Sequence, residues 1–369
     1  MTRRRKRGAG AGPRRGRRPG ASRPALIGLI LLAVAGLGIW SMTGPGPAAR
    51  QGQSTTVLID PGSHLPKIAS TLKSAHVIRS SLLFMTVSKL TGAGRTLKAG
   101  EYAIPSHASV SRILRMLRSG EVVRHFVTLP EGLTSAQAVA ILTATPVLTG
   151  QPQTPPEGSL LPETYQVARG SPREAVLARM RAAQETLMAE LWPQRRDGLP
   201  FSTPEQALVL ASIVEKETGL PDERPRVAAV FVNRLAKGMP LGSDPTVVYG
   251  ISKGVPLGHG LKQSELAAPT PYNTYHFAGL PPTPICNPGK AAIAAVLNPP
   301  KTGELYFVAN GAGGHSFSST MEQHEKNVAR WRQVEHQARA SGQPVGGGPS
   351  FGGGSGVRPE LRRGQANAR

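Results

Sequence analysis

The chain of 369 residues is short of several residue types and motifs that often reveal a protein's chemistry. It has a single cysteine, Cys286, so neither an intramolecular disulfide nor a thiolate metal site can form. Its nine histidines form no HExxH pattern, and it has no GxSxG nucleophile elbow and no Walker loop. We therefore expect no metal and no cofactor, and we look for chemistry carried by carboxylates.

Acidic residues are absent from the first 24 positions, which hold ten Arg or Lys. This tail accounts for ten of the 22 units of net positive charge and leaves +12 for the rest of the chain. The high pI is therefore weak support for nucleic-acid binding, and the remaining sequence lacks the basic-aromatic motifs that such binding uses. We expect no nucleic-acid partner.

Residues 25–42 form an uncharged apolar run. Its length just suffices to cross the hydrocarbon core of a bilayer, and it exceeds the roughly 7–15 residues of a secretory h-region. Small residues at 47–49 (Pro-Ala-Ala) keep a cleaved signal peptide open as the alternative. Because the basic flank stays in the cytoplasm by the positive-inside rule, we predict a single-pass anchor with the main body outside the cytoplasmic membrane.

Composition changes along the chain predict six segments. They are a basic cytoplasmic tail (1–24), a transmembrane helix (25–42), a Pro/Gly linker (43–54), a small strand-and-helix unit (55–125), a larger body (126–338) and a disordered Gly-rich tail (339–369). The predicted fold class is α+β.

Hydrophobic periodicity predicts the elements within the two folded segments. The small unit is expected to contain strands 57–59 and 100–105 and helices 65–77, 80–90 and 109–117. The body is expected to contain strands 126–129 and 305–309 and helices 135–142, 171–191, 204–218, 225–235 and 322–340. Thr134 is placed to cap one helix, and Ser202 with Glu205 has the spacing of a capping box at another. Residues 143–158 and 239–289 are predicted loops, the second long enough to be functional or disordered.

The helix predicted over 204–218 ends in two carboxylates, Glu215 and Glu217, that flank its apolar stripe. The stripe consists of Ala207, Leu208, Leu210, Ala211 and Val214. An acid held against apolar surface has a raised pKa, which lets an enzyme keep a proton ready to donate near neutral pH. The spacing alone favours a simpler alternative, in which both side chains extend into solvent and pair with Lys216, Arg224 or Arg226.

Polar side chains on Pro- and Gly-rich segments after this helix could complete a sugar site, because Tyr, Asn, Asp and Thr combine flat faces with paired donors and acceptors. Any one of them alone is as easily a turn residue or a buried hydroxyl. The candidates for substrate binding or support are Glu217, Asp244, Thr246, Tyr249, Asn273, Tyr275 and His315.

Seven segments in order resemble the YceG-like endolytic murein transglycosylases, also called MltG. The resemblance covers about residues 57–332 and is carried by EGSLLPETY (157–165), ASIVEKET (211–218), VAAVFVNRL (227–235), SDPTVVYGI (243–251), YNTY (272–275), GLPPTPICNPG (279–289) and LYFVANGAGGHSFS (305–318). Long motifs in the right order make this resemblance specific.

The resemblance implies an enzyme of the inner membrane whose catalytic domain faces the periplasm. Such enzymes are lyases that cut nascent peptidoglycan strands internally, at the MurNAc-GlcNAc linkage, and leave 1,6-anhydroMurNAc ends, which would terminate glycan elongation. Glu215 matches the catalytic Glu of the family's EKET motif, and the small unit resembles its LysM-like subdomain. Peptidoglycan synthases are candidate partners. Where the family pattern has His-Asn in the last helix, this chain has His324-Glu325, which puts a binding role there in doubt.

Three alternatives remain at this point. A lysozyme-like muramidase would use the same acid but add water to its product. A non-catalytic scaffold would bind glycan and recruit synthases. A nucleic-acid binder is suggested only by the pI.

Overall fold

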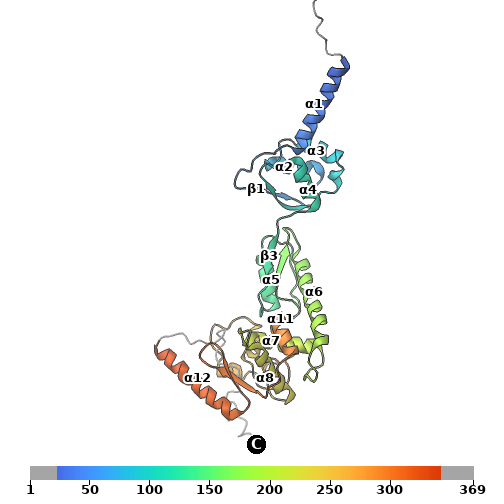
Figure 1. The fold of residues 1–369 in the computed structure, drawn as a ribbon. Coiled ribbons are helices and arrows are strands. Elements are labelled where there is room, and N and C mark those ends of the chain that lie inside the picture. Colours follow the sequence, from blue (N-terminus) through green and yellow to red (C-terminus); the bar gives the residue numbers. More distant parts are fainter. Residues whose placement is uncertain (1–22, 342–369) are drawn as a thin grey trace, which may run out of the picture. The chain divides into compact units, whose positions relative to one another are not determined.

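The computed structural model describes residues 23–341 (Figure 1). Most of the predicted basic tail and most of the predicted disordered tail lie outside the described residues. The described chain is a mixed α+β fold, mostly helical, with three two-stranded antiparallel sheets. Contacts divide it into two compact units, which meet between Val123 and Arg124 in the sequence.

The N-terminal unit packs three helices against one antiparallel pair of strands (Figure 1). Its elements are α1 (Arg23–Thr43), β1 (Ser54–Ile59), α2 (Leu65–Ser74), α3 (Ser81–Leu90), the 3-10 turn η1 (Ala93–Arg95), β2 (Gly100–Pro105) and α4 (Val110–Ser119). β1 pairs with β2, and Ser54 lies opposite Pro105. The Ser80 and Ser109 side chains accept hydrogen bonds from Leu83 N–H and Arg112 N–H and begin α3 and α4. The strands and helices predicted for this region are confirmed.

Helix α1 covers the segment predicted to anchor the chain. Across residues 23–341, no helix meets the combined requirements of length and apolarity for crossing a membrane. The anchor stays a prediction.

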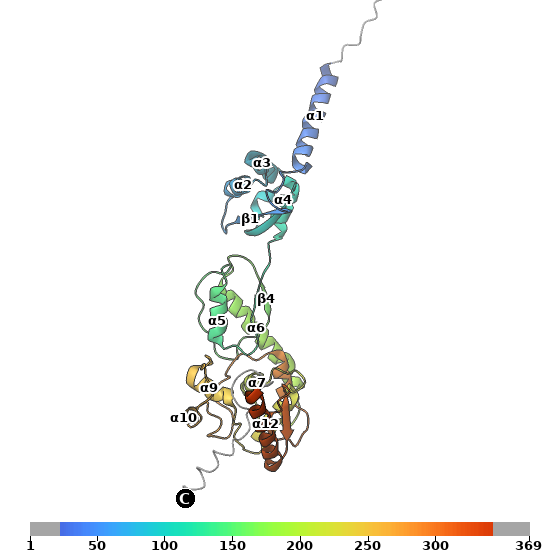
Figure 2. The same ribbon diagram turned by 90° about the vertical axis from the view of Figure 1, so that its left-hand side faces the viewer.

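The C-terminal unit has two hydrophobic clusters. Its elements are β3 (His125–Thr128), α5 (Ser135–Ala144), β4 (Thr164–Val167), α6 (Arg173–Leu191), η2 (Trp192–Gln194), α7 (Pro204–Glu217), α8 (Arg224–Ala236), α9 (Asp244–Ser252), α10 (Gln263–Leu266), α11 (Lys290–Leu297), β5 (Tyr306–Ala309), β6 (His315–Ser318) and α12 (Met321–Ser341). The smaller cluster joins α5 and α6 to the antiparallel pair of strands β3 and β4. Both views show these elements side by side (Figure 1 and Figure 2). The larger cluster joins α7, α8 and α11.

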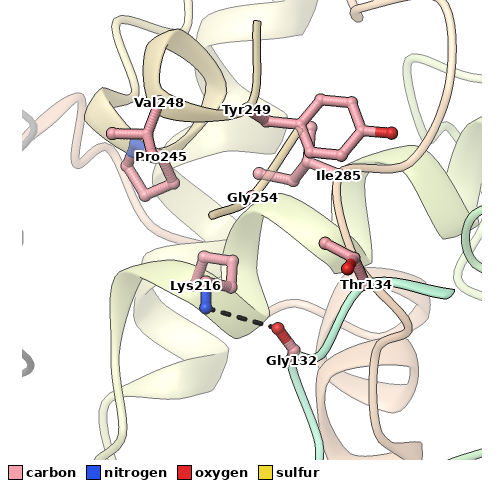
Figure 3. A pocket seen from close by; sticks show the side chains of 8 residues that line it. All are labelled: Gly132, Thr134, Lys216, Pro245, Val248, Tyr249, Gly254 and Ile285. Atoms are coloured by element: carbon pink, nitrogen blue, oxygen red, sulfur yellow. Dashed lines mark hydrogen bonds between the residues drawn. The ribbon is translucent and has the colours of Figure 1, made fainter. Parts of the chain in front are cut away.

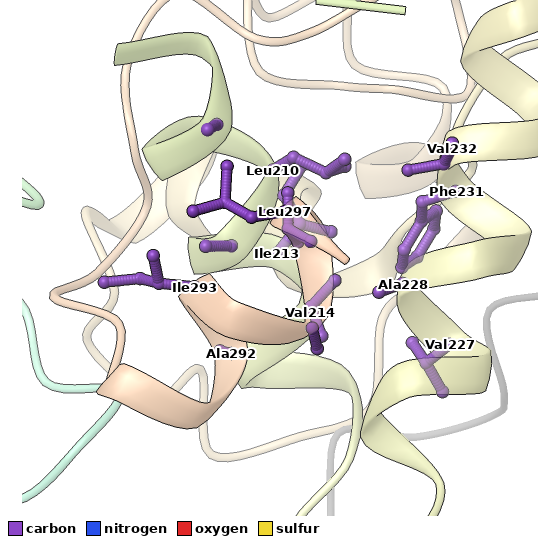
Figure 4. Packing of buried hydrophobic residues seen from close by; sticks show 14 of the residues in the cluster. Leu210, Ile213, Val214, Val227, Ala228, Phe231, Val232, Ala292, Ile293 and Leu297 are labelled. Atoms are coloured by element: carbon purple, nitrogen blue, oxygen red, sulfur yellow. The ribbon is translucent and has the colours of Figure 1, made fainter. Parts of the chain in front are cut away.

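The stripe of α7 is the centre of the larger cluster. Leu210, Ile213 and Val214 are fully buried and point toward α8 and α11, where Phe231 and Ile293 meet them (Figure 4). Burying a side chain of this size contributes about 1.5–3 kcal/mol, so the core holds α7 firmly. Its last turn, which carries the two carboxylates, is therefore fixed in position.

Several predicted details are wrong. The cap of α7 is Thr203 with Gln206, and not Ser202 with Glu205, because the Gln206 side chain reaches back to the Thr203 N–H. The segment 239–289 is not all loop, since α9 and α10 lie within it. α9 escapes a periodicity search because nearly all of its residues are buried, so no polar face alternates with an apolar one. β4, β6 and α11 were also not predicted.

Candidate active site

The carboxylate of Glu215 is buried at the end of α7. Its side chain is only 6% exposed. The Gly289 N–H donates to Glu215 Oε2 at 2.9 Å, and Arg224 Nη2 of α8 lies 3.8 Å from Oε1. The alternative of a solvated, arginine-paired glutamate is therefore correct in one part, since Arg224 lies near this carboxylate. The carboxylate itself points into the protein and away from solvent.

The segment 285–289, which carries Gly289, is held against α7 by hydrogen bonds to one residue, Ser212. The Ile285 N–H donates to Ser212 Oγ at 3.0 Å, and the Cys286 thiol lies 3.3 Å from the Ser212 carbonyl oxygen. Ser212 lies one turn before Glu215 on the same side of the helix. The hydrogen bonds thus fix the distance between Gly289 and the acid.

Asn287 connects this segment to two other parts of the chain. Its Oδ1 accepts from the Leu160 N–H at 3.0 Å, and its Nδ2 donates to the Leu133 carbonyl at 3.0 Å. Backbone bonds link it to Gly132 and Leu133 as well. The side chain is fully buried. Segments around 132, 160 and 287, far apart in sequence, therefore meet beside Glu215.

Burial is the main cause that raises the pKa of Glu215 above its ordinary value. The nearby carboxylate of Glu131 raises it further, whereas the hydrogen bond from Gly289 and the positive charges of Arg224 and Lys216 lower it. The balance is upward, so the group holds its proton to higher pH than a solvated glutamate. This is the property that a general acid requires.

A small hollow of about 320 Å³, including open solvent, lies beside the end of α7 (Figure 3). Pro245, Val248 and Tyr249 of α9 line one side of it, and Lys216 and Thr134 line the other; Gly132, Gly254 and Ile285 complete the wall. Lys216 Nζ donates to the Gly132 carbonyl at 3.3 Å. Gly132 also lies against the acid, because a Cβ built on it would be 3.6 Å from Glu215 Cγ. The hollow therefore adjoins Glu215.

Glu217 belongs to a different cluster, which we call the Arg234 network. It consists of Arg234, Glu217, Ser243, Asp244, Thr246, Thr274 and Tyr275. The Ser243 hydroxyl donates to Glu217 at 2.5 Å, the Tyr275 hydroxyl donates to Asp244 at 2.6 Å, and Thr246 and Thr274 share a 2.9 Å bond. The guanidinium of Arg234 is fully buried and donates to the Leu305 carbonyl at 2.7 Å. This arrangement ties α7, α8 and α9 together.

The remaining predicted residues lie in three places. Tyr249 lines the hollow, and its ring packs against Tyr272 at 4.9 Å. Asn273 is fully buried and donates to the Leu266 and Ala268 carbonyls, so it holds its own loop. His315 Nδ1 lies 2.7 Å from Glu223 Oε2, next to the start of α8.

His324, which directly precedes the Glu325 that departs from the family pattern, is buried. Its ring stacks on Tyr306 at 5.1 Å, and burial lowers its pKa to about 4. Within residues 23–341, no group of three or more His, Cys, Asp or Glu side chains could hold a metal ion.

Sequence reasoning missed three residues that shape the Glu215 site: Glu131, Asn287 and Gly289. Each lies within or next to a segment already considered, but none belongs to a helix whose spacing would give its direction. The signal that was present is the pair of short polar stretches, Pro130-Glu131-Gly132 and Asn287-Pro288-Gly289. Only the tertiary fold brings them together.

The model of the YceG-like family matches residues 57–330. A Bacillus subtilis protein named endolytic murein transglycosylase is 30% identical over 313 residues, which cover 76% of this chain and 86% of that protein. A Streptococcus pneumoniae protein of the same name is 29% identical over 323 residues, 74% of this chain but only 58% of the pneumococcal protein. A crystal structure of a yceG-like protein from Listeria monocytogenes is 30% identical and covers 75% of this chain and 99% of that one, with a TM-score of 0.46.

Proposed function

The chain belongs to the YceG-like family, and we propose that it is an endolytic peptidoglycan lytic transglycosylase with Glu215 as its single general acid and base. The observation that carries this proposal is the buried carboxylate of Glu215, whose pKa is raised by burial and which lies beside an open hollow. The names of the relatives support the reaction class, and the burial of Glu215 supports its assignment as the acid.

The proposed reaction uses one acid twice. The protonated Glu215 carboxyl donates its proton to the oxygen of the linkage after N-acetylmuramic acid, and the bond from that oxygen to the sugar C1 breaks. An oxocarbenium-like sugar forms. The carboxylate then removes the proton from the C6 hydroxyl of the same sugar, whose oxygen bonds to C1. The acid is regenerated, no water is consumed, and the product ends in 1,6-anhydroMurNAc.

The local contacts of Glu215 suit both steps. The hydrogen bond from Gly289 and the charge of Arg224, at 3.8 Å, stabilise the carboxylate that remains after the first proton transfer. The ring closure joins two atoms of one sugar, so it has the high effective molarity of an intramolecular reaction. The hollow beside Tyr249 and Lys216 is where we place part of the glycan.

The place of action follows from the same proposal. The apolar run 25–42 and its basic flank would anchor the chain in the inner membrane with its N-terminus in the cytoplasm. The catalytic unit would then meet nascent glycan strands in the periplasm, and cleavage there would terminate their elongation.

One substitution tests the assignment. The full chain carrying Glu215→Gln should bind glycan strands yet release about 10²–10⁴-fold fewer anhydro-ended fragments, the usual contribution of a general acid. The assay is chromatography and mass spectrometry of digested glycan, with Glu185→Gln on the exposed side of α6 as the matched control. Retained cleavage by Glu215→Gln would remove Glu215 from the mechanism, and loss of cleavage only in Glu217→Gln would move the role there.

A muramidase is the second candidate, because Glu131 places another carboxylate near Glu215. Hydrolytic glycosidases use two carboxylates, one of which can activate water. The product mass separates the two reactions: hydrolysis adds one water to each new end, and transglycosylation does not. Fragments with reducing MurNAc ends would establish the muramidase.

A further inference from the structure

Gly289 occupies a backbone position that does not itself call for glycine. Its φ of −77° and ψ of 165° are ordinary extended values, which any residue adopts. A Cβ built on it, however, would lie 1.7 Å from Glu131 Oε1 and 2.1 Å from Glu131 Cδ. The side chain of Glu131 rests directly on this Cα, and that contact explains the glycine.

The same glycine touches both carboxylates. Its N–H donates to Glu215 Oε2, and the Glu131 carboxylate packs against its Cα. Glu131 is an exposed residue, whereas the Glu215 side chain is only 6% exposed. One carboxylate therefore faces solvent and the other does not, although both contact the same glycine.

We propose that Glu131 is a positioning residue of this site, whose charge, held in place on Gly289, keeps Glu215 in its proton-donating form. Two neighbouring carboxylates resist ionising together. A negative charge on the exposed Glu131 side chain therefore favours the protonated form of the buried Glu215. This inference rests on the proposed function for its catalytic meaning, but its electrostatic content can be measured without any substrate.

The other charged groups that face Glu215 act in the opposite direction. Arg224 belongs to α8, and Lys216 directly follows Glu215 on α7. Both positive charges favour the ionised form of Glu215. Without Glu131, burial alone would oppose the effect of these two cations on the Glu215 pKa. The proposal therefore predicts that removing the Glu131 charge makes Glu215 a stronger acid.

The direct test follows the side-chain carboxyl carbons of the full chain by ¹³C NMR during a pH titration. The Glu215 signal is the one that Glu215→Gln removes. In Glu131→Gln its midpoint should move to lower pH, whereas in the control Glu190→Gln, on an exposed position of α6, it should stay. An unchanged midpoint in Glu131→Gln, with the amide spectrum intact, would overturn the proposal.

A second pair of variants tests whether the contact with Gly289 is responsible. The methyl group of Gly289→Ala would displace the Glu131 carboxylate, so the Glu215 midpoint should again move to lower pH. In a Glu131→Ala background nothing is left to displace, and Gly289→Ala should add no further shift. An equal shift in both backgrounds would show that the effect does not pass through Glu131 and would refute its role.

Activity provides the last readout. A general acid works only while protonated, so the alkaline limb of the kcat/KM profile should move to lower pH in Glu131→Gln. Cleavage retained by Glu215→Gln would defeat the proposed function but leave the NMR result standing. A normal pH profile in Glu131→Gln, with Glu215→Gln inactive, would defeat only the role of Glu131.

Discussion

Two carboxylates only two residues apart at the end of α7 have opposite surroundings. Glu215 accepts one hydrogen bond, from Gly289, and has a cation 3.8 Å away. Glu217 belongs to the Arg234 network, in which serine, threonine and tyrosine hydroxyls close contacts with carboxylates, carbonyls and one another. The first region shields its carboxylate from solvent with few donors, and the second gives Glu217 and Asp244 hydroxyl donors from Ser243 and Tyr275.

This difference separates chemistry from support. A buried carboxylate with few donors resists ionising and can exchange a proton with a substrate, whereas one within a hydrogen-bond network is held in place. The Arg234 network joins three helices, and so it fixes the helix end on which Glu215 stands. Four substitutions test this division, and they run from the largest expected effect to the smallest.

Arg234→Met should have the largest effect on stability. The guanidinium is fully buried and donates to the Leu305 and Leu241 carbonyls. Its loss would remove the donor from these two oxygens and the nearby positive charge from Glu217. Removing one partner from such a buried arrangement costs about 3–5 kcal/mol. Denaturant unfolding of the full chain measures the loss.

Arg226→Met is the matched control on the same helix. Arg226 is half exposed and pairs with Glu304 at the surface, so its replacement should cost less than about 1 kcal/mol. Equal losses in the two variants would mean that burial does not distinguish Arg234, and the comparison between the two regions would fail.

Asn287→Ala should come second, and it should affect the Glu215 region. The substitution leaves the Leu160 N–H and the Leu133 carbonyl without their side-chain partner, at about 2–3 kcal/mol. It also loosens Gly289, so glycan cleavage should fall by at least about tenfold, since small misplacements of catalytic groups are costly. Asn298→Ala, at the exposed end of α11, should change neither stability nor cleavage, and full activity in Asn287→Ala would show that the three-way connection is unnecessary.

How far the sequence predicted the molecule depends on the range of the interactions involved. Local signals placed α7, the cap at Thr134 and the buried strand β5. The resemblance singled out Glu215, which helical spacing alone could not separate from Glu217. The partners of Glu215 come from residues 131 and 289, joined by contacts across 74 residues or more, and no local pattern carries that information. The same limit applies to Asp244 and Thr246, whose hydrogen-bond partners Tyr275 and Thr274 lie about 30 residues further along the chain.

Glu217→Gln should lower stability by about 1–2 kcal/mol and leave cleavage largely intact. The Ser243 hydroxyl can still donate to the amide oxygen, but a bond to a charged acceptor becomes a weaker neutral one, and Arg234 loses a nearby negative charge. Unfolding and cleavage assays on the same preparation measure both quantities, with Glu185→Gln as the exposed control. Loss of cleavage without loss of stability would exchange the roles of the two glutamates.

Glu215→Gln should have the smallest effect on stability and the opposite sign. The pKa of Glu215 is raised in the folded protein from 4.5, so the folded state binds this proton more tightly than the unfolded state does. The wild-type protein therefore has the full benefit below about pH 4.5 and loses it as the pH rises through the raised pKa. Glutamine does not titrate, so the variant should be more stable than the wild type at neutral pH, by about 0.5–1 kcal/mol.

The pH dependence distinguishes this stabilisation from a general one. The difference between Glu215→Gln and the wild type should shrink as the pH falls and vanish below about 4.5, where the wild-type acid is protonated in both states. Unfolding midpoints measured across this range provide the comparison. A variant that is less stable at neutral pH would show that the bond from Gly289 stabilises the ionised carboxylate more than burial destabilises it, and Glu215 would then resemble Glu217. A stabilisation that grows with pH, in a protein that no longer cleaves glycan, is what an acid kept for catalysis at the expense of the fold produces.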